Sequence, residues 1–429
     1  MARARGANGL VAGAFSTTGY AGIPTSGFRL LPVVSLDLGE DQGIMEDDLL
    51  GLGRDPQDGG DDVIVNEGQA VVPVDLRNFG FWLKLMLGAP TTGDGIAAFG
   101  SISFSAQPAN NATVTIGGTA VTFVTGTPTA GQVKIGATLE ATINALLAVL
   151  NTSADAGIAA ATYGALASGR GIAVFHKTLG TSGNSFTLAA GTSPASAGTV
   201  SGATLSGGAA SGGHRHVFVG GKLDHPDAAL QIGMPEVPHY GMNYGVMGNN
   251  MSIQMQRSGM LNATLDLIAQ GENTGAASMA GSLETAWVVE RFSQFAGVVE
   301  ADGVPLGKVE STTLRIANNL DKDESIRPDG RIGGADPAKL AVSLDITVRF
   351  ADRVMHDKAT ARTPITVRLA WQISPTKRLE FVMSRVRLPR RKAGLTGPNG
   401  IRVTFPGVAT KASNGETIRA VLINDVAAY

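Results

Sequence analysis

The chain has 429 residues, of which 43% are apolar, 16% are charged and 5% are aromatic, with 57 glycines and no cysteine. This length allows roughly two to four folded domains, and the glycine-rich, aromatic-poor composition favours many short strands joined by tight turns. The formal net charge of −2 excludes a globally basic nucleic-acid-binding domain, and the lack of cysteine excludes disulfides, thiolate chemistry and cysteine-based metal centres.

The N-terminal segment, residues 1–19, has two arginines followed by a short apolar stretch that glycine interrupts. Such a stretch is too weak for the apolar part of a secretory signal and far shorter than a membrane span. We therefore expect no membrane insertion, and we expect the chain to remain in the compartment where it is made.

An acidic stretch follows, with nine acids and one arginine between Glu40 and Asp62. Its irregular spacing and its glycine and proline content predict a long loop rather than a preorganised pair of catalytic carboxylates. The loop is either a solvated face or a contact surface for another subunit. Its acids are Glu40, Asp41, Glu46, Asp47, Asp48, Asp55, Asp58, Asp61 and Asp62.

The next segment, "VPVDLRNFG" (Val72–Gly80), alternates apolar and polar residues, and "VSLDITVRF" (Val342–Phe350) closely resembles it. Asp75 and Asp345 hold the same position in the two segments, 270 residues apart. The similarity predicts two copies of one strand-rich unit, although alternating strands also align by chance.

A second pair of segments supports the duplication at a different offset. "HPDAALQIGMPEV" (His225–Val237) matches "SPTKRLEFVMSRV" (Ser374–Val386) at 149 residues, so the register changes by 121 residues. A stretch of that length, residues 93–213, is rich in alanine, threonine, glycine and serine. We therefore predict an insertion in the first copy.

The inserted stretch predicts a small β-β-α-β-β domain on the outer surface. Gly117 and Gly118 mark a hairpin turn, and apolar residues at helical spacing after Thr138 predict a capped helix that ends near Asn151. Two further strands follow, and glycine- and serine-rich linkers join this domain to the rest of the chain.

Three histidines, His214, His216 and His225, are the best metal-ligand candidates, because alternating histidines share one face of a strand. No carboxylate lies at ligand spacing, so we favour ordinary polar positions at the start of a strand and expect no metal or cofactor. The sequence has no nucleophile elbow, P-loop, dinucleotide fingerprint or metalloprotease helix, so we expect no enzyme.

Two apolar groups lie between residues 234 and 295. Six methionines, from Met234 to Met260, are either core residues on strands or an adaptable subunit interface. Further on, "SLETAWVVERFSQF" has Leu283, Trp287 and Phe295 among apolar residues at helical spacing, which predicts a packed amphipathic helix.

A basic stretch between Lys377 and Lys392 has seven cations and one acid, Glu380. Acidic and basic patches on a nearly neutral chain are typical of head-to-tail self-assembly. Direct DNA binding is the alternative, but the stretch lacks aromatic residues that would stack on bases. The predicted inter-subunit patch comprises Arg385, Arg387, Arg390, Arg391 and Lys392, and Lys377 and Arg378 precede it.

Four segments carry a resemblance to a known family. They are "FAGVVEADGVPLGKVESTTLRIANNLDKDESI", "LAVSLDITVRFAD", "TPITVRLAWQI" and "LPRRKAGLTGPNGIRVTFPGVATKASNGETIRAVLIND". Together they resemble the tail tube (major tail) proteins of long-tailed bacteriophages. The resemblance is best in the second half of the chain and weaker over residues 20–97 and 214–275.

The resemblance implies a mainly β fold with flanking helices, built from tail-tube-type β-sandwich or barrel domains. We expect a discontinuous first domain (residues 1–97 and 214–280), an inserted α+β domain (98–213) and a second domain (281–429). Because six such folds usually form one ring, a duplicated chain would form a ring of three, and an unduplicated chain a ring of six.

It further implies a structural protein of the virion tail, assembled in the bacterial cytoplasm. Stacked rings would conduct the DNA genome, and the chain would contact itself, the tape measure, terminator and distal tail proteins, and DNA in passage. The acidic loop would reach the neighbouring ring. Asp75 and Asp345 are candidates to face the lumen, because acidic walls keep the duplex mobile.

Two other functions remain open at this point. A tail terminator or connector would share the fold but form a single ring. A surface glycan-binding β-repeat protein is the other alternative, although only Trp82, Trp287 and Trp371 are available to stack on sugars.

Overall fold

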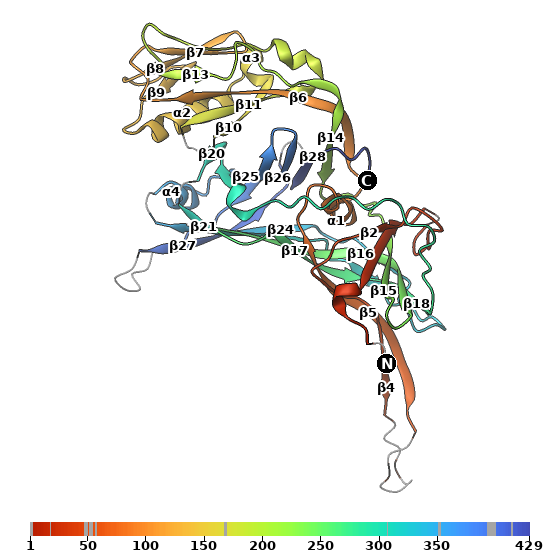
Figure 1. Ribbon diagram of the computed structural model, residues 1–429. Coiled ribbons are helices and arrows are strands. Elements are labelled where there is room, and N and C mark those ends of the chain that lie inside the picture. The colour runs from red at the N-terminus through yellow and green to blue at the C-terminus, as the bar shows by residue number, and fades with distance from the viewer. Residues whose placement is uncertain are drawn as a thin grey trace.

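The computed structural model describes residues 3–17, 19–46, 50, 55, 58–166, 170–306, 308–350, 353–392, 400–412 and 415–429. The chain is mainly β with a few helices, as predicted (Figure 1). A large, mostly antiparallel sheet system forms a wall, and a smaller layer of strands and helices lies over it, at the top of Figure 1.

The wall consists of two runs of elements in nearly the same order. The first run is β1 (Leu10–Phe15), β2 (Arg29–Leu30), β3 (Ser35–Asp37), β4 (Glu40–Met45), β5 (Gly60–Pro73), α1 (Phe79–Leu87), β15 (Ala228–Met234), β16 (His239–Gln256), β17 (Asn262–Ile268) and β18 (Gly271–Gly275). The second is β19 (Gly297–Ala301), β20 (Val304–Pro305), β21 (Val309–Ala317), β22 (Asp321–Asp323), β23 (Gly334–Asp336), β24 (Ala341–Arg349), α4 (Val354–Ala361), β25 (Ile365–Ser374), β26 (Lys377–Arg387), β27 (Arg402–Ala409) and β28 (Arg419–Asn424). The order differs in that β22 and β23 of the second run pair with each other where β4 of the first run pairs with β5.

Strand pairing repeats between the two runs. In the first run β1 pairs with β2 and β15, β16 pairs with β15, β17 and β18, and β5 pairs with β3 and β17. In the second run β19 pairs with β20 and β25, β26 pairs with β25, β27 and β28, and β24 pairs with β21 and β27. Every one of these pairs is antiparallel.

Irregularities repeat at matching places as well. The β15–β16 ladder shifts register between Ala228 and Leu230, and the β25–β26 ladder shifts between Ile365 and Val367. A bulge bends its strand and fixes the direction of the residues that follow it. The two runs therefore share the local bend as well as the order of their strands.

The two sequence matches that predicted a duplication do not occupy matching places. Val342–Phe350 is almost entirely strand β24, whereas β5 ends at Pro73 and helix α1 begins at Phe79. The strand pairs instead match β5 with β24, and β15 with β25 rather than β26. Alternation has a period of two in every strand, so it cannot distinguish registers that differ by an even number of residues, whereas hydrogen-bond partners can.

Side-chain alternation explains why the wall forms. In β24, Val342, Leu344, Ile346 and Val348 are buried in one large core, while the residues between them lie on the opposite face. Helix α1 has eight of its nine residues buried in or beside that core. The helix is therefore fixed against the sheet rather than exposed at its edge.

The smaller layer has its own core, whose buried residues all lie between Ala98 and Leu205. We call it the outer layer. Its elements, with the two strands that lead to and from it, are β6 (Thr91–Phe104), β7 (Thr113–Ile116), β8 (Thr119–Val124), β9 (Gln132–Lys134), α2 (Leu139–Thr152), α3 (Ala156–Ala159), β10 (Ala161–Ala165), β11 (Gly171–Leu179), β12 (Leu188–Ala190), β13 (Gly198–Val200) and β14 (Ala209–Val219).

Within the outer layer, the predicted hairpin and helix are confirmed. Gly117 and Gly118 have positive φ at the β7–β8 turn, a conformation that favours glycine. Thr138 caps α2 by accepting a hydrogen bond from the Ala141 N–H at 3.1 Å. The layer has more strands than predicted, because short segments such as β9 and β13 carry no clear alternation.

Strands β6 and β14 connect the outer layer to the wall. They pair with each other, with Asp94 opposite His214, and β14 also pairs with β28 of the wall. The predicted domain limits at residues 98 and 213 fall inside these two strands. Those limits remain a prediction.

The predicted helix at residues 282–295 is wrong. This segment links the two runs in a largely extended form, and its backbone bonds residues before α1: Leu76 N–H donates to Glu290 O, and Phe292 N–H donates to Val74 O. Val288 is 75% exposed and Phe295 is 84% exposed. Long-range backbone partners thus override the helical spacing of the apolar residues.

Candidate assembly surfaces

The acidic stretch forms a projecting hairpin rather than the irregular loop expected from its glycine and proline content. Strand β4 pairs with the first part of β5, with Glu40 opposite Asn66 and Met45 opposite Gly60. We call β4 and Gly60–Asn66 the arm. Figure 1 shows it extending away from the wall, on the side opposite the outer layer.

Most of the predicted acids lie exposed on or beside the arm. Asp41, Glu46, Asp55, Asp58, Asp61 and Asp62 are exposed. Asp47 and Asp48 lie outside the described residues. Ile44 and Val63 are also exposed, by 78% and 61%, so the arm presents apolar side chains among its acids. Such a mixed surface, projecting from the body, suits contact with another protein.

The base of the arm is fixed to the second run. Arg331 donates to both carboxylate oxygens of Glu40 at 2.6 and 2.9 Å, and Lys322 pairs with Glu67. Ile64 N–H donates to Gly330 O at 2.9 Å. Beside these contacts lies a hollow of about 410 Å³, and Ile326 on its rim is fully exposed.

The basic patch lies at the end of β26 and just beyond it. Arg385 is half-buried, whereas Arg387, Arg390, Arg391 and Lys392 are exposed. Among the described residues, these five cations form no ion pair with the acids of the arm. The exposed cations and the exposed acids of the arm are thus not paired with one another in the described part of the chain.

Lys377 and Arg378 point elsewhere. Lys377 Nζ donates to Glu290 at 2.8 Å, and Arg378 is buried at the junction between wall and outer layer. There Arg378 stacks on Phe175 of the outer layer at 4.4 Å. The basic sequence stretch thus divides into an internal part and an exposed part.

The same junction contains a buried ionic cluster. Arg368 donates to Glu380 at 2.9 Å and to Glu300 at 2.9 Å. Burial alone would raise the pKa of Glu380, but the charges of Arg378 and Arg368 lower that pKa to about 2. These charges therefore hold Glu380 ionised beneath the outer layer.

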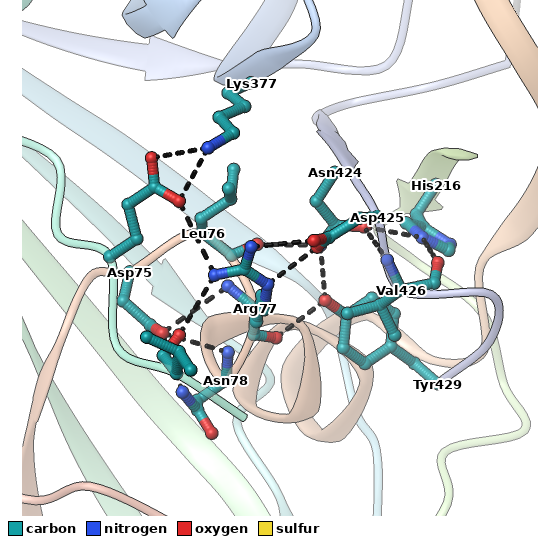
Figure 2. Close-up of polar contacts among 12 residues, drawn as sticks. Asp75, Leu76, Arg77, Asn78, His216, Lys377, Asn424, Asp425, Val426 and Tyr429 are labelled. Carbon is teal, nitrogen blue, oxygen red and sulfur yellow. Dashed lines mark hydrogen bonds and ion pairs between the residues drawn. The ribbon is translucent and has the colours of Figure 1, made fainter. Parts of the chain in front are cut away.

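Asp75 does not face a lumen, because its side chain is fully buried. Figure 2 shows it beneath the start of α1, where it accepts hydrogen bonds from Phe79 N–H at 2.9 Å and the Asn78 side chain at 2.7 Å. Burial raises the pKa of Asp75, and these hydrogen bonds oppose that rise. Its role is to cap α1.

Asp345, the other lumen candidate, lies on the polar face of β24. Its side chain is 34% exposed and accepts a hydrogen bond from Arg315 at 2.5 Å. Its place on a lumen wall remains a prediction.

A contact network joins the start of α1 to the last residues of the chain (Figure 2). Arg77 donates twice to Asp425, at 2.7 Å each, and Asn424 donates to Leu76 O at 2.7 Å. Tyr429 donates its hydroxyl to Arg77 O at 2.6 Å. No local sequence signal reveals this network, because its partners are about 350 residues apart.

The three histidines hold ordinary positions, and His225 is half-buried, where burial lowers its pKa. His214 contacts Asp94 at 2.9 Å, and buried His216 contacts Val426 O at 2.8 Å, where burial lowers its pKa. No group of three or more potential ligands is present in the described part of the chain. The four methionines Met242, Met247, Met251 and Met255 are core residues, whereas Met234 and Met260 are exposed.

In the described ranges, every helix is too short or too polar to cross a membrane. A family model of phage tail tube proteins matches residues 152–409, which is more than half of the chain. The chain belongs to the phage tail tube protein family. No curated protein matches the chain. Membership of this tail tube family implies self-assembly, a structural rather than enzymatic role, and a place in the virion tail.

We predict that Asp75→Ala destabilises the chain by about 2 kcal/mol, because the backbone N–H groups of Arg77, Asn78 and Phe79 and the side-chain amide of Asn78 lose their acceptor at the start of α1. Asp75→Asn should cost less, since its amide oxygen still accepts and carries no charge to bury. Urea unfolding of unassembled protein measures both changes. Equal stability of Asp75→Ala and the unchanged chain would contradict the capping role.

Acid should weaken the junction beneath the outer layer. Because the pKa of Glu380 is lowered from 4.5 to about 2, its stabilisation is present above pH 4.5 and is lost as the pH falls toward 2. Glu380→Gln should therefore flatten the pH dependence of the melting temperature over this range. Glu310→Gln, at an exposed pair with Arg402, is the control and should leave the profile unchanged.

Proposed function

We propose that this chain is a structural virion protein that polymerises as stacked rings into the hollow tail tube, which conducts the DNA genome into the host. We further propose that three chains form one ring with pseudo-sixfold symmetry. The observation that carries the ring of three is the repeated strand pairing, because each chain supplies two runs of the same topology.

Unpaired sheet edges favour ring closure. Among the described residues, β3 and β4 pair with β5 and with no other strand, so their outer edge has no strand partner, although the Glu40 N–H donates to the Glu272 side chain at 3.1 Å. At the other end of the wall, β27 pairs along its length with β24 and meets β26 at two positions. Edge strands add further strands readily, and a closed ring satisfies both edges.

The arm is suited to contact between successive rings. It projects from the wall, carries exposed acids, and presents Ile44 and Val63 to the surroundings. The outer layer would then lie on the outside of the tube, and the polar face that carries Asp345 is a candidate lining of the lumen. The tape measure, terminator and distal tail proteins are the proposed partners at the tube ends and in its interior.

Negative-stain electron microscopy of the purified protein tests this proposal. We expect hollow tubes or stacked rings whose end-on averages have three outer projections, one for each outer layer. Six projections would mean one chain per position and would contradict the ring of three. Single rings that never stack would favour the tail terminator or connector, which shares the fold.

Shortening the arm tests its role in stacking. Replacing residues 43–63 with a two-residue turn between Gln42 and Ile64 should leave closed rings but prevent tubes, because exposed Ile44 and Val63 and the acids beside them are removed. A matched control shortens the exposed loop at residues 126–131 of the outer layer, which should leave tube length unchanged. Tubes of normal length from the arm variant would contradict this assignment.

A further inference from the structure

The two runs of one chain are joined by a continuous antiparallel ladder. Strand β16 of the first run pairs with β21 of the second, from Asn250 opposite Ala317 to Gln256 opposite Ser311. If the runs are equivalent, the same ladder should form between the second run of one chain and the first run of the next. This inference rests on the proposed ring and supplies the register of the strands that would pair between neighbouring chains.

The added strand needs an edge to pair with in the next chain, which we call the acceptor edge. The strand pairs beside this edge identify its residues. Ser35 lies opposite Val71, and Ser311 lies opposite Thr347, so both partners are displaced by 276 residues (311 − 35 and 347 − 71). The last residues of β5 and β24, Pro73 and Arg349, have the same displacement. Residues 35–41 therefore correspond to residues 311–317 of the in-chain ladder.

The segment that would add to this edge, which we call the donor segment, is the counterpart of the part of β16 that pairs with β21. The repeated bulges identify its residues. Ala228 lies opposite Val246, and Ile365 lies opposite Val386, each at the end of its shifted ladder. The shift from Val246 to Val386 is 140 residues, so the counterpart of Asn250 is Arg390. The donor strand therefore begins within the basic patch.

We propose that Arg390–Lys392 of each chain add as an antiparallel strand to the β3–β4 edge of the next chain in the ring. In this register Arg390 lies opposite Asp41 of the partner subunit, and Arg391 lies opposite Glu40 of the partner subunit. Lys392 then faces Gly39 of the partner subunit. The basic patch and the acidic edge thus meet side by side within one ring.

Charge complementarity supports this register. All three donor cations are exposed, and Asp41 is exposed at the start of the arm. Residues directly opposite on antiparallel strands share one face with Cβ atoms about 5 Å apart, so Arg390 can reach the carboxylate. Glu40 already binds Arg331, which makes Asp41 the principal partner.

The in-chain ladder has no charge at this place, since Asn250 faces Ala317. At this position the between-chain ladder would have Arg390 opposite Asp41 of the partner subunit, whereas the in-chain ladder has two neutral residues, and its one cation, Arg315, lies opposite neutral Ser252. This difference distinguishes the two junctions. Complementary charges favour the correct partner and register more than they add affinity. Ring closure should therefore depend on salt, whereas the fold of one chain should not.

Cysteine cross-linking tests the register directly, because the chain has no native cysteine. Cα atoms of opposite residues lie about 4.5 to 5.5 Å apart, within disulfide range. Assembled protein with Arg390→Cys and Asp41→Cys should give, on oxidation and denaturing electrophoresis, bands of two and three linked chains. As a positive control, Asn250→Cys with Ala317→Cys should form its disulfide within one chain, without a change in mass.

An off-register pair, Arg390→Cys with Ser35→Cys, should not cross-link, since Ser35 lies about 20 Å along the edge from Asp41. Rings or tubes that form without the 390–41 cross-link, or with an equal 390–35 cross-link, would overturn the register and leave the proposed function intact. Absence of rings from the unchanged protein would instead overturn the proposed function and the register with it.

A charge exchange covers the case in which the cysteine variant fails to assemble. Arg390→Asp alone should reduce the assembled fraction at least tenfold at low salt. Adding Asp41→Arg should restore it, because the opposite pair is re-formed with the signs exchanged. Failure of the second change to restore assembly of a folded chain would also overturn the proposed contact.

Discussion

The requirement that backbone N–H and C=O groups find partners governs this structure more than any single side-chain contact. An antiparallel sheet can satisfy its interior strands but always leaves two edges. Here the chain satisfies one such edge internally, by pairing β16 with β21. The edge at β3 and β4 has no equivalent partner among the described residues, so the sheet of one chain is an incomplete portion of a larger one.

Charged residues are arranged around this backbone constraint. The arm is fixed at its base by Glu40 and Arg331, so its acids project in a defined direction. The buried cluster of Arg368, Glu300 and Glu380 lies at the junction with the outer layer, where removal of one partner would leave an uncompensated charge. Among the described residues, the exposed cations after β26 form no ion pair, which is consistent with a role between chains.

Sequence patterns were sufficient for the fold class and for local elements with distinctive signals. The Gly117–Gly118 turn and the helix after Thr138 were predicted correctly, because each depends on residues close in sequence. The alignment of the two runs was wrong in detail, because alternation alone does not fix register. Asp75 was misassigned for a related reason, since its hydrogen bonds to Asn78 and Phe79 occur only because the chain turns there.

The connection between helix and sheet differs greatly between the two runs. Residues 362–364 are enough to join α4 to β25, whereas the whole outer layer lies between α1 and β15. The short connection demonstrates that the wall needs no more than a tight turn at this position. The α1–β15 connection is therefore a suitable site for replacing the outer layer. A foreign domain whose ends lie as close together as β6 and β14 could take its place and be displayed at regular intervals along the assembled protein.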